Sequence, residues 1–208
     1  ELEKALISFE KAFSIKSEKV EIINTIISIL NEVNDPKISV DYYQKIIKNS
    51  PEQYLVHFNL GTVYQEQGDT DNAINSYKKT LEFQPEFIDA YLNLGIIYEE
   101  TGQLDESMKS LERAIEIDPT NPLAYNNLGI TLKSLDRIDD AIESFKQAIL
   151  ISPDHPDANN NLGMLLVKFH KSDIATPFLR TALKGNSSSE PHWVNYISAL
   201  INSNELDK

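Results

Sequence analysis

The tripeptide Asn-Leu-Gly recurs four times at a constant spacing, and no other feature constrains the fold as strongly. The copies begin at Asn59, Asn93, Asn127 and Asn161, so that each lies 34 residues after the last. Chance recurrence in strict register is very improbable, and the tripeptide therefore marks an internal repeat. A period of 34 residues is typical of repeats that consist of two helices joined by a turn. We expect an all-α chain in which such repeats stack on one another.

A second pattern lies on the other helix of each repeat. It places a small residue, a bulky residue and a small residue at offsets of four and three, as in Ala141, Phe145 and Ala148. These offsets put the three side chains on one face of a helix. Small residues let two helices approach closely, and the bulky one fills the gap between them. The same pattern appears within residues 1–16, so the sequence opens on a second helix.

Prolines set the boundaries of the repeats, because each one stops the helix before it. They stand 34 residues apart at Pro51, Pro85, Pro119 and Pro153. We expect one array over residues 1–208. It would comprise the second helix of a truncated repeat (1–19), five full repeats (20–53, 54–87, 88–121, 122–155 and 156–189) and the first helix of a further repeat (190–208).

Two local details of the array can also be predicted. Pro177 interrupts the second helix of the fifth full repeat, and we favour a late start for that helix over a bend, with Ser172 expected as an N-cap. Ile27 and Ile197 replace the glycine of Asn-Leu-Gly, so the helices should cross at a wider distance there.

The complete series of Leu-Gly, tyrosine, alanine, bulky residue, alanine and proline resembles the tetratricopeptide repeat (TPR) family. The register holds from Ala5 to Asn195 without an insertion, so the resemblance covers essentially the whole chain. Departures at Thr25-Ile26-Ile27 and at Ser17 affect local packing and leave the repeat intact. The resemblance implies a right-handed superhelical solenoid that is used for protein–protein interaction.

Composition excludes several classes of function. The formal net charge of −13 argues against general binding to nucleic acid, which requires clustered lysine and arginine, and it suits a basic partner. There is no cysteine, so a disulfide framework or a thiolate metal site is impossible. No apolar run approaches the ~18 residues of a membrane span. The first residues have no secretion signal; we leave the compartment open and expect the cytoplasm before others.

Residues that could carry chemistry do not converge. The four histidines are His57, His155, His170 and His192, and no pair has helical metal-ligand spacing with a third ligand nearby. The glycines lie mostly in Leu-Gly and in turns, so none form a phosphate-binding loop. We therefore expect no catalytic residue, no metal and no cofactor, and hence no enzyme activity within these residues.

The asparagines of the repeat are the best candidates for a binding site. Asn195 continues the series, which then comprises Asn59, Asn93, Asn127, Asn161 and Asn195, with Thr25 at the equivalent place of the first full repeat. First helices line the concave face of such an array, so the side chains should form a ladder along a groove. An amide donates and accepts at once and can bind a peptide backbone of any sequence. Packing between neighbouring repeats is an equally weighted role for them.

Other residues should share that groove. The face of each first helix that carries the asparagine also carries the residue just before it and the residue three places after it. The pair of residues six and seven places after the asparagine lies there too. The expected set is Thr62, Glu66, Leu92, Ile96, Glu100, Asn126, Ile130, Lys133, Asn160 and Met164. It contains no basic clamp for a C-terminal carboxylate. The groove should be acidic toward its N-terminal half, so a bound peptide would prefer basic residues at one end.

The asparagine ladder also looks like the TPR region of O-linked N-acetylglucosamine transferases, whose groove asparagines hold acceptor polypeptides. Residues 191–201 look, more weakly, like the last repeats before bacterial glycosyltransferase or sulfotransferase domains. The expected function is a non-catalytic scaffold that binds an extended peptide. Two alternatives stay open: a substrate-recruiting region of a larger glycosyltransferase-like or sulfotransferase-like enzyme, and self-association through apolar ends that expose Phe9 and Trp193.

Overall fold

The computed structural model describes residues 19–33, 35–186 and 189–203, and this part of the chain consists of eleven helices without a strand. The expected opening helix, with its apolar residues Leu2, Leu6, Phe9 and Phe13, lies outside the described residues, as do residues 204–208. The fold is the all-α repeat architecture that the 34-residue period predicts.

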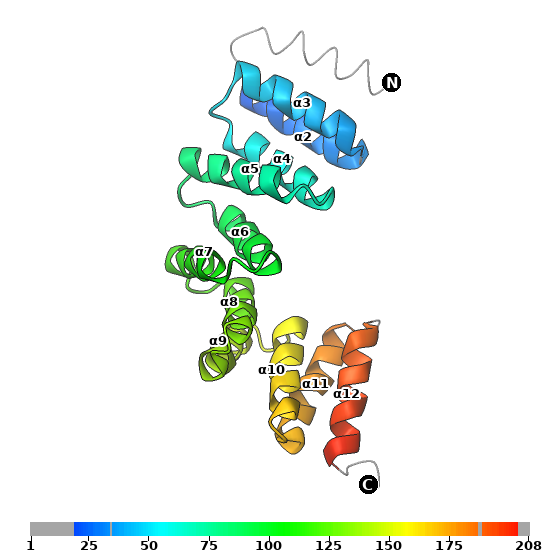
Figure 1. Cartoon of the computed structure of the whole chain (residues 1–208). Helices are drawn as coiled ribbons and strands as arrows, with labels where there is room; N and C mark the ends of the chain where they lie inside the picture. Colours follow the sequence, from blue (N-terminus) through cyan, green and yellow to red (C-terminus); the bar gives the residue numbers. More distant parts are fainter. Residues whose placement is uncertain (1–18, 34, 187–188, 204–208) are drawn as a thin grey trace. The chain divides into compact units, whose positions relative to one another are not determined.

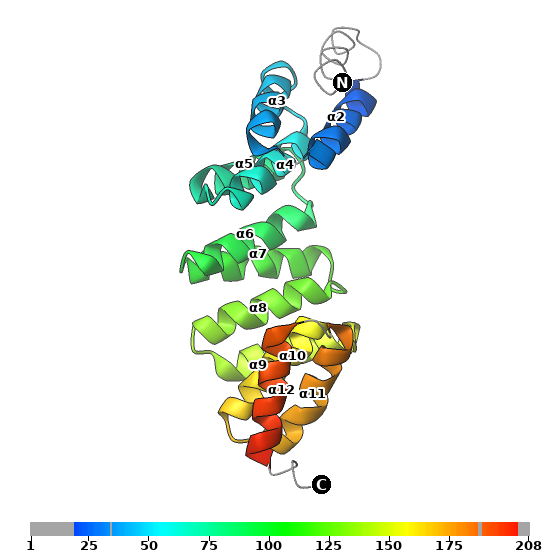
Figure 2. The same ribbon diagram turned by 90° about the vertical axis from the view of Figure 1, so that its right-hand side faces the viewer.

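The helices alternate between the first and the second place of a repeat (Figures 1 and 2). The first helices are α2 (Lys19–Val33), α4 (Tyr54–Glu66), α6 (Ile88–Glu100), α8 (Pro122–Ser134), α10 (Pro156–Lys168) and α12 (Glu190–Ser203). The second helices are α3 (Pro36–Asn49), α5 (Thr70–Phe83), α7 (Leu104–Ile117), α9 (Ile138–Ile151) and α11 (Ser172–Gly185). The chain divides into two compact units: unit 1 is Glu1–Ala90 and unit 2 is Tyr91–Lys208.

Capping residues explain where several helices begin. Asp35 accepts hydrogen bonds from the backbone N–H groups of Lys37 and Ile38, and Pro36 occupies the first helical position. Asn121 caps α8 in the same way, with Pro122 after it. Such a cap satisfies backbone donors that have no partner inside the helix, and a proline there loses no hydrogen bond.

The turn between paired helices requires one residue in the left-handed backbone region. Gly68 and Gly102 both have φ of 74° at this place. The equivalent residues 34 places further on are Asp136, with φ of 59°, and His170, with φ of 56°. Only glycine adopts this conformation without a steric cost, so the last two turns are strained where the first two are not.

The glycine of Asn-Leu-Gly is where paired helices approach most closely. A Cβ atom built on Gly61, Gly95, Gly129 or Gly163 would lie 2.5–2.7 Å from the bulky side chain of the second helix. That side chain is fully buried in every repeat: Tyr77, Leu111, Phe145 and Leu179. Ile27 stands in place of the glycine in α2, where it is half-buried and packs against the cluster that contains Ile26 and Tyr43.

Pro177 lies inside α11, which begins at Ser172, so the favoured late start of this helix is wrong. Ser172 is the first helical residue rather than the N-cap, a place that Lys171 takes without a side-chain hydrogen bond. The helix gains from burying Ala175, Thr176 and Leu179, and this burial outweighs the one backbone hydrogen bond that proline cannot donate.

Candidate functional site

Helix α4 of unit 1 holds three of the expected groove residues, Asn59, Thr62 and Glu66. The Asn59 Nδ2 atom donates to the Leu55 carbonyl of its own helix at 2.7 Å, and Thr62 Oγ1 donates to the Phe58 carbonyl at 3.3 Å. Both side chains are half-buried, while Glu66 is exposed at the end of α4. Because its amide is satisfied within α4, Asn59 keeps only part of its hydrogen-bonding capacity for a ligand.

In unit 2 the structure brings four of the expected residues together around one hollow. Ile96 and Glu100 come from α6, while Asn127 and Ile130 come from α8, and the space between them measures about 260 Å³. Ile96 and Ile130, one from each helix, supply its apolar lining. Gly95 lines the hollow as well, while the place of its missing Cβ atom is taken by Leu111 of α7. The hollow is therefore a small apolar depression with an amide and carboxylates at its edges.

The charge at this hollow is negative. Glu99 and Glu100 line it, and no lysine, arginine or histidine does. Glu99 Oε1 accepts a hydrogen bond of 2.8 Å from Ser134 Oγ at the end of α8. This bond joins α6 to α8 and holds the Glu99 carboxylate at the edge of the hollow. Glu100 is exposed and forms no ion pair with the described residues.

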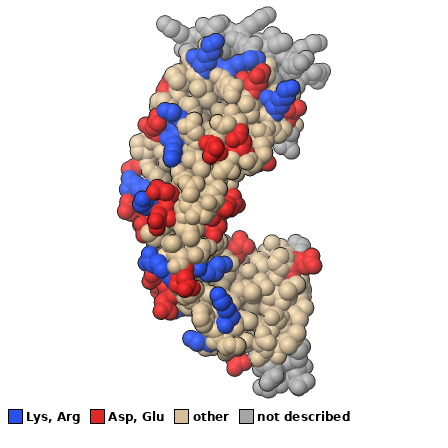
Figure 3. Space-filling model, viewed as in Figure 1, with Lys and Arg blue, Asp and Glu red and all other residues tan. Residues whose placement is uncertain are grey.

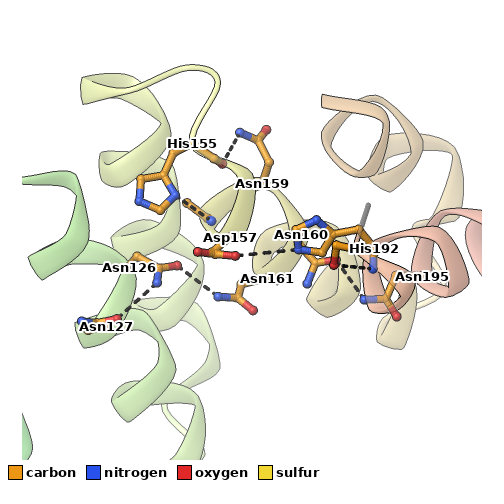
Figure 4. A network of polar contacts seen from close by, with 11 residues as sticks. Asn126, Asn127, His155, Asp157, Asn159, Asn160, Asn161, His192 and Asn195 are labelled. Carbon is orange, nitrogen blue, oxygen red and sulfur yellow. Dashed lines mark hydrogen bonds and ion pairs between the residues drawn. The ribbon is translucent and has the colours of Figure 1, made fainter. Parts of the chain in front are cut away.

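A chain of amides runs from α10 to α8 (Figure 4). Asn161 Nδ2 donates to Asn126 Oδ1 at 3.0 Å, and Asn126 Nδ2 donates to Asn127 Oδ1 at 3.3 Å. Because every amide in the chain donates in the same direction, the two ends differ. Asn127 keeps its Nδ2 donors, and Asn161 keeps its Oδ1 acceptor, without a hydrogen bond to the described residues.

The next pair of first helices repeats the same bond. Asn195 Nδ2 of α12 donates to Asn160 Oδ1 of α10 at 2.9 Å, and Figure 4 shows the two amides facing each other. In both cases the partner is the residue 35 places earlier, just before the previous ladder asparagine. The equivalent residue for Asn127 is Leu92, which has no polar group. Asn161 and Asn195 thus serve packing between repeats, whereas Asn127 does not.

Some expected groove residues are less accessible than the sequence implied. Leu92 is 7% exposed and Asn126 is 4% exposed, so both belong to the interior, where Leu92 packs and Asn126 serves Asn161. Asn93 is half-buried. Lys133 is exposed on α8, and Met164 is 38% exposed on α10. Of these residues, Lys133 and Met164 offer the most surface to a ligand.

Sequence reasoning did not identify Thr131 as part of this region. Thr131 lines the hollow at full burial, and its hydroxyl lies 2.8 Å from Ser107 Oγ, which also donates to the Gly95 carbonyl at 2.7 Å. These bonds fix α7 against both first helices beside the hollow. Ser107 occupies a small-residue place of the repeat, but nothing in the repeat pattern singles out Thr131.

Metal-ligating side chains do not gather into a site anywhere in the part of the chain that the structure describes. The described residues contain no group of three histidine, aspartate or glutamate side chains that could hold a metal ion. His192 is buried and its Nε2 lies 3.8 Å from Asp157 Oδ1, but this pair stands alone in the interface of α10 and α12. Among the described helices, none is both long and apolar enough to cross a membrane.

Several solved structures share this fold, and two of them are described as TPR proteins. MamA is 25% identical, with a TM-score of 0.70 over 78% of this chain and 95% of that chain. YrrB, described as a TPR protein with an unusual peptide-binding site, is 21% identical, with a TM-score of 0.69 over 89% and 96%. PilF of Pseudomonas aeruginosa is 17% identical, with a TM-score of 0.77 over 88% and 83%. No curated protein matches the sequence significantly. The likeness to O-linked N-acetylglucosamine transferases stays a prediction.

Family models for the TPR match the sequence directly. The TPR repeat model covers residues 63–102 and 97–136, and two tetratricopeptide repeat models cover residues 122–155 and 42–75. Together they span residues 42–155, which is 114 of the 208 residues. The chain therefore belongs to the tetratricopeptide repeat family.

Proposed function

We propose that this protein is a non-catalytic scaffold that binds an extended peptide segment along the first helices of unit 2. The observation that carries the proposal is the hollow between α6 and α8, where the Asn127 amide stands beside apolar walls from Ile96 and Ile130. A peptide in extended form presents a backbone carbonyl to the Asn127 Nδ2 donors while a side chain enters the hollow. TPR proteins bind protein or peptide partners, and YrrB, which shares the fold, is described with a peptide-binding site.

Ladder residues contribute unequally in this proposal. Asn127 offers donors, whereas Asn161 and Asn195 already donate to Asn126 and Asn160 and offer mainly their Oδ1 atoms. The ladder can then accept from peptide N–H groups at α10 and α12 and donate to a carbonyl at α8. Amides that are already held by the protein lose less conformational entropy on binding, which favours affinity.

The test is selection of binders from a library of capped, extended peptides, followed by affinity measurement with variants. Asn127→Ala should weaken a selected peptide about tenfold, the effect of losing one well-placed hydrogen bond from a desolvated site. The matched control is Gln147→Ala on α9, an amide that bonds only to Glu143 of its own helix. Equal affinities for the Asn127 variant, the control and the wild type would refute the site, and a library without binders would refute the function.

The last described helix favours a second candidate, self-association. The side chains of Trp193, Val194, Ile197 and Ile201 are 47–58% exposed on α12, and the visible surface there carries few charges (Figure 3). Such a contiguous apolar face is typical of an interaction surface. Light scattering should give a mass that rises with concentration and falls in Val194→Glu, but not in the control Leu150→Glu on α9, whose side chain is 74% exposed. A strictly monomeric wild type would refute this candidate.

A further inference from the structure

The hollow between α6 and α8 combines three properties that select one kind of occupant. Its walls are the branched aliphatic side chains of Ile96 and Ile130, and its volume of about 260 Å³ admits a side chain. Its edge carries the carboxylates of Glu99 and Glu100. An occupant must therefore be apolar along its stem and positively charged at its tip.

The lining favours neither of two simpler occupants, an anionic side chain and a purely aliphatic one. An anionic side chain would meet two carboxylates without a lining cation, and like charges close together are repulsive. A purely aliphatic side chain would bury its apolar surface but would gain nothing from the negative charge of the two carboxylates. Lysine and arginine meet both requirements, since their methylene stems pack on apolar surface while the charged group stays at the wet edge.

A hydrogen bond already holds one of the carboxylates in place. Ser134 Oγ donates to Glu99 Oε1 at 2.8 Å, so the Glu99 side chain does not have to be ordered when the cation arrives. Glu100, one residue along α6, is exposed and is free to turn toward a charged tip. Lys133 on α8 is the nearest cation in sequence, but it does not line the hollow.

We infer that the hollow lined by Ile96, Ile130, Glu99, Glu100 and Asn127 is a specificity pocket for a lysine or arginine side chain of the bound peptide. This inference rests on the proposed function and adds to it the chemical class of the segment that unit 2 recognises. Asn127 holds the peptide backbone at the mouth of the pocket, which directs the side chain that follows into it.

The pocket can be tested separately from the peptide groove by using single residues. The probes are Nα-acetyl-arginine methylamide and Nα-acetyl-lysine methylamide, with Nα-acetyl-norleucine methylamide as the uncharged control of similar length. Each is titrated into the intact protein while the backbone amide signals are followed by NMR. We expect the arginine and lysine probes to shift the signals of Ile96, Glu100 and Ile130 and to bind more weakly at high salt.

Variants of the two carboxylates test whether charge determines the binding of the probes. Glu99→Gln and Glu100→Gln should each weaken the arginine probe about threefold, the scale of a partly exposed ion pair, and leave the norleucine probe unchanged. Glu112→Gln on α7, an exposed carboxylate outside the hollow, is the control. Equal binding of all three probes, or no shift at these residues up to the solubility limit, would overturn the inference.

The two proposals fail in different ways. If selected peptides bind in an Asn127-dependent manner but show no preference for lysine or arginine, the specificity pocket is wrong and the scaffold function stands. If no peptide binds while the arginine probe still shifts the α6 and α8 signals, the pocket exists and the peptide groove is wrong.

Discussion

The two units use one 34-residue register to place different polar contacts. In unit 1 the bulky place of the second helix holds Tyr43 and Tyr77, whose hydroxyls reach back to the first helix of the same repeat. Tyr43 Oη donates to Asn31 Oδ1 at 3.4 Å and Tyr77 Oη to Gln65 Oε1 at 2.7 Å. In unit 2 that place holds Leu111, Phe145 and Leu179, which have no hydroxyl.

Unit 2 instead forms side-chain bonds between first helices of successive repeats. Asn161 donates to Asn126, Asn195 donates to Asn160, and Ser134 donates to Glu99. The difference teaches that a repeat register determines where side chains lie but not which groups they form hydrogen bonds with. A buried polar group must find a partner, and the nearest one depends on the residue that each repeat happens to supply.

The largest expected effect concerns the buried tyrosine of unit 1. Burial raises the pKa of Tyr43 to about 12 from its usual 10.0, since the phenolate is poorly solvated there. The folded state therefore holds a proton that the unfolded chain loses above pH 10. The stability that comes from the protonated form is complete below pH 10 and falls by about 1.4 kcal/mol per pH unit up to about pH 12.

Urea unfolding on both sides of pH 10 measures this loss, with Tyr43→Phe as the comparison. The variant should lose less stability than the wild type as the pH rises, and hydrogen exchange of α3 amides should show the difference in unit 1. Trp193, the single tryptophan, lies in unit 2, and its fluorescence reports that unit separately. Parallel pH profiles for wild type and variant would contradict the prediction.

Glycine substitutions should show where the two units are equivalent. A Cβ atom on Gly61 would lie 2.7 Å from Tyr77 Cε1, and one on Gly129 would lie 2.6 Å from Phe145 Cε1. Gly61→Ala and Gly129→Ala should therefore each lower the free energy of unfolding by about 1–3 kcal/mol, the cost of overpacking. Thermal or urea unfolding checks this, with Asn75→Ala on exposed α5 surface as a control. An unchanged free energy of unfolding in one unit alone would show that the second helix there moves to accommodate the added methyl group.

A double-mutant cycle should separate the bonded ladder positions from the unbonded one. We expect Asn126→Leu and Asn161→Ala to be coupled by about 0.5–1.5 kcal/mol, because each amide is the partner of the other. The matched pair 34 residues earlier is Leu92→Ala with Asn127→Ala, where no hydrogen bond exists. That coupling should stay below about 0.5 kcal/mol. Equal couplings for the two pairs would mean that the hydrogen bond between the two side-chain amides contributes nothing to stability.

The smallest effect concerns the turns. Gly68 in unit 1 takes the left-handed conformation at no cost, whereas His170 in unit 2 holds φ of 56° as a non-glycine residue. His170→Gly should raise the free energy of unfolding by about 0.5–1 kcal/mol through relieved strain, and Gly68→Ala should lower it by about 1 kcal/mol. The melting temperature should change in the same directions. Calorimetry of both variants checks the signs. A stabilising Gly68→Ala would contradict the argument.

The repeat and its helix pairs could be predicted from the sequence because the pattern recurs. Asn-Leu-Gly, the small–bulky–small series and the prolines each show the same period. A departure from the pattern in one repeat therefore does not obscure the helix pairs, because the equivalent positions of the other repeats keep it. Pro177 shows the limit of local reasoning. Its preference against a helix interior is a local energy, and burial of Ala175 and Leu179, supplied by the rest of unit 2, exceeds it.

The candidate site was only partly predictable. Ile96, Glu100, Asn127 and Ile130 share a face by helical periodicity alone, and the structure places them at one hollow. Leu92 and Asn126, which each stand just before a ladder asparagine, were expected on the same face, yet both are buried. Thr131 gave no signal, because its role depends on Ser107 of another helix. Periodicity gives the face of a helix, but accessibility also depends on how the next helix covers it.

The sequence by itself determined the fold, because a 34-residue period with glycine and a bulky side chain facing each other admits one way of pairing helices. Only the tertiary structure decided what the asparagines do. Asn127 and Asn161 both stand in Asn-Asn-Leu-Gly, and Asn195 continues their register, but the residue 35 places earlier is leucine for Asn127 and asparagine for the other two. The Asn127 amide, beside a leucine, donates no hydrogen bond to the described residues, whereas the amides of Asn161 and Asn195 donate theirs to another amide.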